Sequence, residues 1–362
     1  MRLRVWDLPT RLFHWLLVAG VATCAVTGFL LPSRWLAWHF AAGYLLAALL
    51  VFRLVWAFFG PEHSRWPGFC PKPGAVIAHV RAVLAGRPHA SIGHNPAGGA
   101  MILALLLTLT LLVGSGLLTV GGMLKLGPFA FFMPYDAAMA VKELHEAAAN
   151  LLMVLAATHI LGVIVESRLL REWLIGAMLT GWKRAPDGSP TPRPRAPWAA
   201  PLAALAVAAT VGGGMALSHL PKAGWHPLPP LPAYAQECGT CHMAYHPSLL
   251  SADSWRQVMA HLDTHYGENA GLPPQRRDAI AQWLTANAAE QWDTLASHRL
   301  GRAPLAADGL LSSNSWWKRK HRHLDPAVFQ RAAIKTSENC AACHRDATSG
   351  LFTPQAIHIP AP

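Results

Sequence analysis

Five long apolar stretches constrain this chain more than any other feature of its sequence. They cover roughly residues 12–31, 37–59, 97–120, 143–165 and 198–219. Each approaches or exceeds the ~20 residues that a helix needs to cross the hydrocarbon core of a bilayer. Since runs of this length in lipid satisfy their backbone hydrogen bonds as helices, the sequence predicts an all-α membrane part with five spans.

The composition agrees with a membrane protein. Of the 362 residues, 52% are apolar and 14% are charged, against about 25% charged in a typical soluble domain. The formal net charge of +11 does not point to nucleic acid, because the basic residues lie mostly in short loops between the apolar stretches. They form no basic motif of a known nucleic-acid-binding kind.

The basic residues also orient the spans. With the N-terminus in the cytoplasm, the outer loops carry only Arg34, Lys125 and Lys142. The inner segments carry thirteen basic residues: Arg2, Arg4, Arg11, Arg65, Lys72, Arg81, Arg87, Arg168, Arg171, Lys183, Arg184, Arg193 and Arg195. Because cytoplasmic loops are enriched in Lys and Arg, this orientation is strongly favoured.

Two Pro-rich segments, 183–197 and 221–232, mark the boundaries between domains. We expect a membrane domain over 1–182 with four spans in a helix bundle. A linker over 183–232 then contains the fifth span, and a small, mostly helical domain follows over 233–362.

Two Cys-x-x-Cys-His pentads lie in the C-terminal domain. They are Cys238-Gly239-Thr240-Cys241-His242 and Cys340-Ala341-Ala342-Cys343-His344. Paired thiols at this spacing attach to the two vinyl groups of haem, and the adjacent histidine binds the iron. Cys-x-x-Cys pairs also bind zinc, but zinc does not require a histidine directly after each pair. The pentads therefore predict two covalently bound c-type haems.

The pentads test the predicted topology independently. Haem is attached to such motifs outside the cytoplasm, so an odd number of spans must precede them. The fifth stretch, rich in Ala and Gly, could by itself be a buried helix of a soluble domain. Five spans nevertheless deliver residues 233–362 to the periplasm, whereas four would not. We therefore expect a multi-pass protein of the bacterial inner membrane, with a cytoplasmic N-terminus and a periplasmic C-terminal domain.

The second axial ligand of each c-type haem has several candidates. These are His246, His261, His265, His298, His321, His323 and His358. If the first pentad continues into a helix, His246 lies on the same face as His242 and cannot bind the opposite side of the same iron. The remaining cysteines, Cys24 and Cys70, have no framework spacing and are expected to be free thiols.

Four histidines in the predicted spans lie at two depths. His14 and His39 begin the first and second spans. His145 begins the fourth, and His159 lies fourteen residues, or about 21 Å, further along it. His39 and His145 therefore fall near the periplasmic side, and His14 and His159 near the cytoplasmic side. Since histidine is rare within spans, this pairing predicts two bis-histidine b-type haems stacked across the bundle.

Three stretches in residues 1–182 resemble the bacterial b561-type cytochromes, a family that includes the b subunit of nickel–iron hydrogenases. They are Val5–Trp15, Gly93–Pro96, and His145–Leu151 followed by His159. The resemblance implies a four-helix bundle, two haem b groups and quinone as redox partner. It also implies the iron-ligand role for His14, His39, His145 and His159, in agreement with their depths.

Residues 233–362 resemble a periplasmic dihaem cytochrome c family. The matching stretches are Glu237–Tyr245, His265–Ala270, Trp316–His321 and Asn339–His344. The resemblance favours His265 and His321 as distal iron ligands. His246 departs from the family, which tends to have proline there, and no role is assigned to it.

These observations predict a transmembrane electron-transfer protein with two haem b and two haem c groups. Electrons from membrane quinol would pass through the b haems to the c haems and then to a soluble periplasmic haem protein. The chain would then act as a quinol:cytochrome c oxidoreductase without a catalytic side chain of its own. Two alternatives are a subunit passing electrons from a periplasmic donor to quinone, and a haem enzyme reducing a small oxidant. His94 is a candidate quinone residue by motif only, with a helix-capping role at the membrane interface as the alternative. A homodimer is left open.

Overall fold

The computed structural model describes residues 1–87, 91–185, 188–240 and 242–361. Within these ranges the chain forms two compact units. The first unit comprises Met1–Gly116 and Val141–Ala216, and the second comprises Leu117–Ala140 and Leu217–Pro362. The connection between the third and fourth spans therefore belongs to the same unit as the C-terminal residues.

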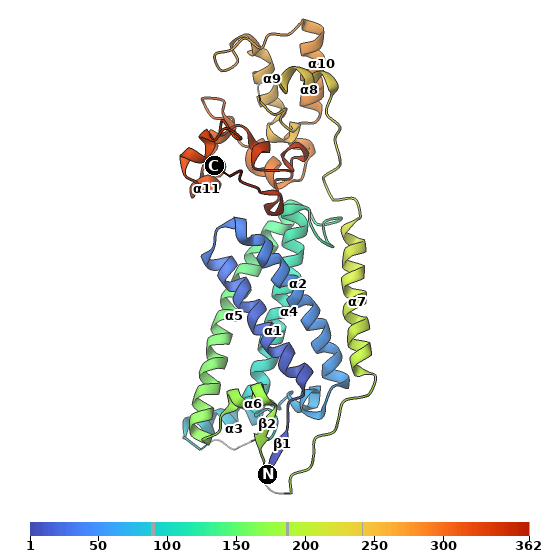
Figure 1. Ribbon diagram of the computed structural model, residues 1–362, viewed down its shortest axis with the longest axis vertical. Helices are drawn as coiled ribbons and strands as arrows, with labels where there is room; N and C mark the ends of the chain where they lie inside the picture. Colours follow the sequence, from blue (N-terminus) through green and yellow to red (C-terminus); the bar gives the residue numbers. More distant parts are fainter. Residues whose placement is uncertain (88–90, 186–187, 241, 362) are drawn as a thin grey trace. The chain divides into compact units, whose positions relative to one another are not determined.

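In the part of the chain that the structure describes, five helices have the length and composition to cross a membrane, as the sequence predicted. They are α1 (Leu8–Ala25), α2 (Leu36–Phe59), α4 (Pro96–Leu124), α5 (Tyr135–Leu170) and α7 (Ala199–Ser218) (Figure 1). Helix α5 has 36 residues and is about 54 Å long, so it exceeds a hydrocarbon core of about 30 Å. A π-helical turn over Val26–Leu30 prolongs α1.

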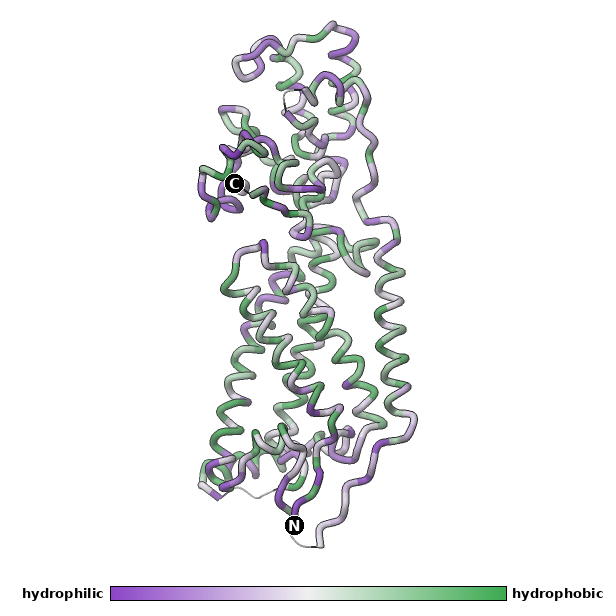
Figure 2. Tube along the Cα trace, in the orientation of Figure 1, coloured by the Kyte–Doolittle hydropathy of each residue, from purple (hydrophilic) through white to green (hydrophobic). Residues whose placement is uncertain are grey.

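Local sequence explains how the first span begins. The side chain of Asp7 caps α1 by accepting a hydrogen bond from the Thr10 backbone N–H at 3.2 Å, and Pro9 lies in the first turn. Further along the bundle, α4 and α5 bury Leu109, Leu112, Ala148 and Leu152 against one another. Figure 2 shows that hydrophobic residues follow the spans, whereas the C-terminal residues are mixed in hydropathy.

Smaller elements that the sequence analysis did not anticipate close one end of the first unit. Strand β1 (Arg2–Arg4) pairs antiparallel with β2 (Trp182–Arg184), with Leu3 opposite Lys183. Two short helices, α3 (Pro73–Leu84) and α6 (Leu174–Thr180), belong to the same unit. Leu3, Val5, Trp6, Ala177 and Ala185 form a buried cluster that ties the N-terminus to the segment after the fourth span.

The C-terminal residues form a small helical fold with much irregular backbone. Its helices are α8 (Pro232–Cys238), α9 (Ala252–Ala260), α10 (Pro274–Ala286) and α11 (Ser315–His321). The core contains Tyr234, Leu249, Trp255, Ile280 and Leu284, all buried. This agrees with the predicted small, mostly helical domain after the membrane part.

Candidate haem sites

Two predicted ligands from different spans face each other in the first unit. The ring of His39 on α2 lies 6.2 Å from that of His145 on α5, measured between ring centres, and the planes are inclined by 67°. A metal held between two imidazole nitrogens by bonds of about 2 Å separates the ring centres by about 6 Å. The geometry of this pair therefore fits two axial ligands of one iron.

Hydrogen bonds fix the orientation of both rings. His39 Nδ1 lies 3.1 Å from the Cys24 carbonyl oxygen and 3.1 Å from Thr27 Oγ1. His145 Nδ1 has the same two kinds of partner. It lies 3.0 Å from the Leu112 carbonyl oxygen and 3.1 Å from Ser115 Oγ. A proton held on Nδ1 leaves the lone pair of Nε2 free for iron, so both rings are set in the ligating tautomer.

A glycine beside each hydroxyl residue makes room for the ring. A Cβ atom built on Gly28 would lie 3.3 Å from His39 Cε1, and one built on Gly116 would lie 3.1 Å from His145 Cε1. Both cradles thus follow one pattern: a carbonyl, a hydroxyl residue three positions later, and a glycine directly after it. The sequence contains the hydroxyl–glycine pairs 27–28 and 115–116, but it does not indicate that each pair faces a histidine of another helix.

The other predicted membrane pair lacks such a cradle. His14 on α1 and His159 on α5 lie close enough for their charges to interact. His14 Nδ1 is buried and has no hydrogen-bond partner among the described residues. Nδ1 of His14 is therefore not held in the way that Nδ1 of His39 and Nδ1 of His145 are.

In the C-terminal unit, each pentad histidine faces one of the distal candidates. The ring centres of His242 and His265 are 6.2 Å apart, and those of His344 and His321 are also 6.2 Å apart. These separations match that of the membrane pair His39–His145. His265 follows a short turn after α9, and His321 is the last residue of α11.

Backbone carbonyls hold two of these rings, and burial keeps a third, that of His344, neutral. His242 Nδ1 lies 2.7 Å from the Met243 carbonyl oxygen, and His321 Nδ1 lies 2.9 Å from that of Trp317. Burial, with a smaller contribution from His321, lowers the pKa of His344 to about 4. The ring of His344 is therefore neutral at physiological pH, which is the form that binds iron.

The pentad cysteines occupy different local structures. Cys238 ends α8, and Cys340 begins a turn of 3₁₀ helix over Cys340–Ala342 that leads to Cys343. Cys241 lies outside the described residues. Among the described residues, no group of three or more His, Cys, Asp or Glu side chains gathers in a way that could hold a metal ion. The described arrangement is therefore one of facing pairs.

The other distal candidates have different partners. His246 is 5% exposed and its Nδ1 lies 2.8 Å from Ser248 Oγ. Burial, and then the nearby His226, lower the pKa of His246 to about 4. His298 Nε2 lies 2.9 Å from Asp293 Oδ1, and His261 Nδ1 lies 2.9 Å from the Gln257 carbonyl oxygen. These contacts give His246 a structural role, consistent with its departure from the resembled family.

His94, the motif-based quinone candidate, is half-buried beside aromatic rings. Its ring centre lies 4.5 Å from that of Trp6. Burial, and next the Arg53 guanidinium, lower the pKa of His94 to about 3. Asn95, and not His94, caps the following helix, because Asn95 Oδ1 accepts a hydrogen bond from the Gly98 N–H at 2.6 Å.

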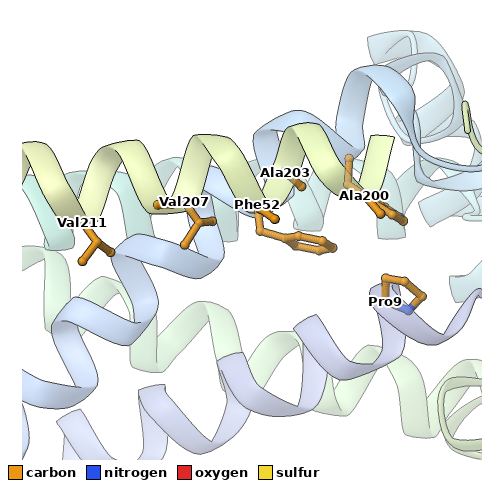
Figure 3. A pocket seen from close by; sticks show the side chains of 9 residues that line it. Pro9, Phe52, Ala200, Ala203, Val207 and Val211 are labelled. Atoms are coloured by element: carbon orange, nitrogen blue, oxygen red, sulfur yellow. The ribbon is translucent and has the colours of Figure 1, made fainter. Parts of the chain in front are cut away.

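An apolar pocket of about 590 Å³ lies between α7 and the first two spans (Figure 3). It is lined by Pro9, Phe52, Trp56, Ala200, Ala203, Ala204, Val207, Ala208 and Val211. The small alanine side chains of α7 leave this space. At its wall, the Trp56 indole N–H donates to Asp7 Oδ2 at 3.2 Å, and the Phe52 ring lies 6.1 Å from that of Phe13, the neighbour of His14.

Comparisons with known families divide the chain into two matched ranges. Residues 5–181 match the family model of prokaryotic cytochrome b561, and residues 234–352 match that of dihaem cytochrome c. Helix α7 lies outside both ranges. The pocket beside α7 is therefore formed in part by residues that neither family match includes.

Similar proteins fall into the same two groups. A "Probable Ni/Fe-hydrogenase B-type cytochrome subunit" of Rhizobium leguminosarum bv. viciae is 27% identical over 210 residues, which cover 49% of this chain and 87% of that protein. The corresponding hydrogenase 1 subunit of Escherichia coli (strain K12) is 28% identical and covers 49% of this chain and 79% of its own length.

The C-terminal residues are similar to solved dihaem cytochromes. A "Diheme cytochrome c from Rhodobacter sphaeroides" is 39% identical, covering 34% of this chain and 96% of that chain, with a TM-score of 0.29. A dihaem cytochrome c from Shewanella baltica OS155 is 30% identical, covering 37% of this chain and 96% of that chain, with a TM-score of 0.30.

Proposed function

Because the chain joins a prokaryotic cytochrome b561 unit to a dihaem cytochrome c unit, we propose that it carries electrons from membrane quinol to a soluble periplasmic haem protein. The chain is a membrane electron-transfer protein of haem b and haem c. The route runs through two b haems and then two c haems. The proposal rests on three histidine pairs whose ring centres share one separation. They are His39 with His145, His242 with His265, and His344 with His321.

The proposed ligands follow from the facing pairs. His39 with His145 and His14 with His159 hold the two b haems. Cys238 and Cys241 attach one c haem between His242 and His265. Cys340 and Cys343 attach the other between His344 and His321. Haem supplies one-electron chemistry when it is bound. Two histidines on each iron leave no open coordination position, which suits electron transfer better than reduction of a small oxidant.

The proposed location is the bacterial inner membrane, with the N-terminus in the cytoplasm and residues 233–362 in the periplasm. Thirteen basic residues on the inner side against three on the outer side support this orientation. The five helices long enough to span also support it, because an odd number of spans separates the two ends.

The apolar pocket beside α7 is our candidate entry for the isoprenoid tail of quinol. Its lining is apolar along the helix from Ala200 to Val211, so it suits a hydrocarbon chain arriving from the bilayer. The pair of Phe52 and Phe13 connects its wall to the residue before His14. A quinol held there would meet the chain near the His14–His159 pair.

A second candidate function is electron flow in the opposite direction, from a periplasmic donor to quinone. The similarity of residues 5–181 to hydrogenase b-type subunits favours it, because those proteins are named as subunits of an enzyme. The fused dihaem unit speaks against a hydrogenase partner, since this chain carries its own additional carrier of electrons.

The experiment that separates the two directions uses purified protein in proteoliposomes with a reduced quinone analogue. We expect haem b absorbance to change first and haem c absorbance to follow. His14→Ala, which removes a proposed b ligand, should abolish haem c reduction by quinol while dithionite still reduces haem c. Failure of quinol to reduce either haem class, together with quinone reduction by a periplasmic donor, would establish the opposite direction.

A further inference from the structure

Asp293, in the C-terminal unit, collects partners from three separate segments. Its Oδ2 accepts hydrogen bonds from Lys125 Nζ at 2.8 Å and from the Tyr135 backbone N–H at 2.8 Å. Its Oδ1 lies 2.9 Å from His298 Nε2, and its backbone N–H donates to the Gly224 carbonyl at 2.8 Å. Asp293 thus joins the connection between α4 and α5 to His298 within the dihaem fold and to Gly224, which precedes that fold.

Because Lys125 is buried, the stability of its charged side chain depends on this contact. The Lys125 side chain is 0% exposed, and besides Asp293 its ammonium group donates to the Met133 carbonyl at 3.3 Å. A buried ammonium left without its carboxylate is strongly destabilising. Lys125 also adopts a left-handed backbone conformation with φ of 55°. Its position is therefore tied to Asp293.

Further contacts surround this ion pair. The ring of His298 stacks on that of Tyr135 with centres 4.0 Å apart, and Arg299 Nε donates to the Tyr135 hydroxyl at 2.8 Å. The Ala223 backbone N–H donates to the Ala130 carbonyl at 2.9 Å. We call the set Lys125, Tyr135, Asp293, His298 and Arg299 the clamp.

The clamp combines residues from the two family matches. Lys125 and Tyr135 lie in the range matched by cytochrome b561, and the other three lie in the range matched by dihaem cytochrome c. Tyr135 is also the first residue of α5, which continues without a break to His145, ten residues or about 15 Å along the helix. Tyr135 of the clamp therefore lies on the same helix as His145, a proposed b-haem ligand.

We propose that Asp293 is a positioning residue, which fastens the dihaem fold to the α4–α5 connection so that electrons pass between b and c haems at a fixed distance. This inference rests on the proposed function. Without the clamp, the Pro-rich residues 221–232 would act as a tether of up to about 37 Å, at about 3.1 Å per residue. Because tunnelling rates fall steeply with distance, a tethered domain would exchange electrons only during its closest approaches.

The test follows redox equilibration between haem b and haem c absorbance after flash photoreduction of the full-length protein in nanodiscs. This readout does not depend on quinol or on direction. In the unaltered protein we expect equilibration whose rate does not change with solvent viscosity. Asp293→Asn should slow it about tenfold or more and make it viscosity-dependent, with covalent haem content and low-spin spectra preserved. Asp278→Asn, an exposed carboxylate on α10, is the matched control and should behave as the unaltered protein.

Two milder variants keep the test decisive if Asp293→Asn fails to mature. Tyr135→Phe and Arg299→Gln break the Tyr135–Arg299 hydrogen bond without stranding the Lys125 charge, and should each slow equilibration about two- to threefold. Viscosity-independent equilibration at the unaltered rate in a mature Asp293→Asn protein, or in both milder variants, would overturn the clamp. Absence of any b-to-c equilibration in the unaltered protein would instead overturn the proposed function.

Discussion

The membrane unit and the C-terminal unit hold their candidate haem ligands by different physical means. In the membrane unit the ligands come from helices, and hydrogen bonds that the rings donate to groups such as Thr27 and Ser115 orient them. In the C-terminal unit the ligands lie on turns and the end of a short helix, and cysteines at 238 and 340 offer covalent attachment. The difference predicts that losing a histidine has unlike consequences in the two units.

The largest expected effect is loss of a whole haem from the membrane unit. His159→Ala removes an axial ligand where no thioether bond retains the cofactor, and where little water is available to replace the imidazole. We expect about half of the haem b absorbance to disappear while haem c content is unchanged, measured by pyridine haemochrome spectra. His79→Gln, a buried histidine of the same unit outside the facing pairs, is the control. An unaltered b spectrum in His159→Ala would remove His159 from the ligand set.

A distal histidine of the C-terminal unit should behave differently. In His321→Ala the haem remains attached through Cys340 and Cys343, so haem c content should stay constant. One of the two c haems should change from low-spin to high-spin and bind carbon monoxide when reduced, because its sixth position opens. Optical and electron paramagnetic resonance spectra measure this. His261→Ala, which alters an exposed histidine, is the control and should leave the protein low-spin. Loss of haem from His321→Ala would contradict the expected difference between the two units.

The pocket beside α7 gives a third test, since only the membrane unit needs to admit quinol. Ala204→Phe places a ring in the pocket, and we expect quinol-driven reduction of haem b to slow about tenfold while dithionite reduction is unchanged. Leu205→Phe, at an exposed position of α7 outside the pocket lining, is the matched control. Equal slowing in both variants would indicate a general effect on α7, and no slowing in Ala204→Phe would place quinol elsewhere.

The smallest expected effect concerns the cradles. Thr27→Val removes one of two acceptors near His39 Nδ1 but keeps the Cys24 carbonyl. A weaker hydrogen bond makes the imidazole a poorer donor to ferric iron, so the midpoint potential of one b haem should rise. A hydrogen bond worth about 1 kcal/mol corresponds to about 40 mV for one electron. Potentiometric titration should show this rise in Thr27→Val and none in Thr108→Val, which alters a buried threonine of α4.

Much of this arrangement could be predicted from the sequence, because it depends on long-range periodicity and on spacing. Span lengths, the depths of His14, His39, His145 and His159, and the two pentads are all visible along the chain. The cradles could not be derived in this way, since Ser115 and His145 meet across two helices and thirty positions. The clamp joins Lys125 to Asp293 over 168 positions, and neither residue stands out in its own segment. Pairing of β1 with β2 was missed because three-residue strands carry too little periodicity to detect.

The most direct test of the account is the haem stoichiometry and spin state of the purified full-length protein. Acidified acetone should extract half of the haem, the two b groups, and leave half covalently bound, and all four should be low-spin in both redox states. This result follows because each of the four proposed histidine pairs occupies both axial positions of one haem iron. One extractable haem for every two bound haems, or a high-spin c haem in the unaltered protein, would contradict the account.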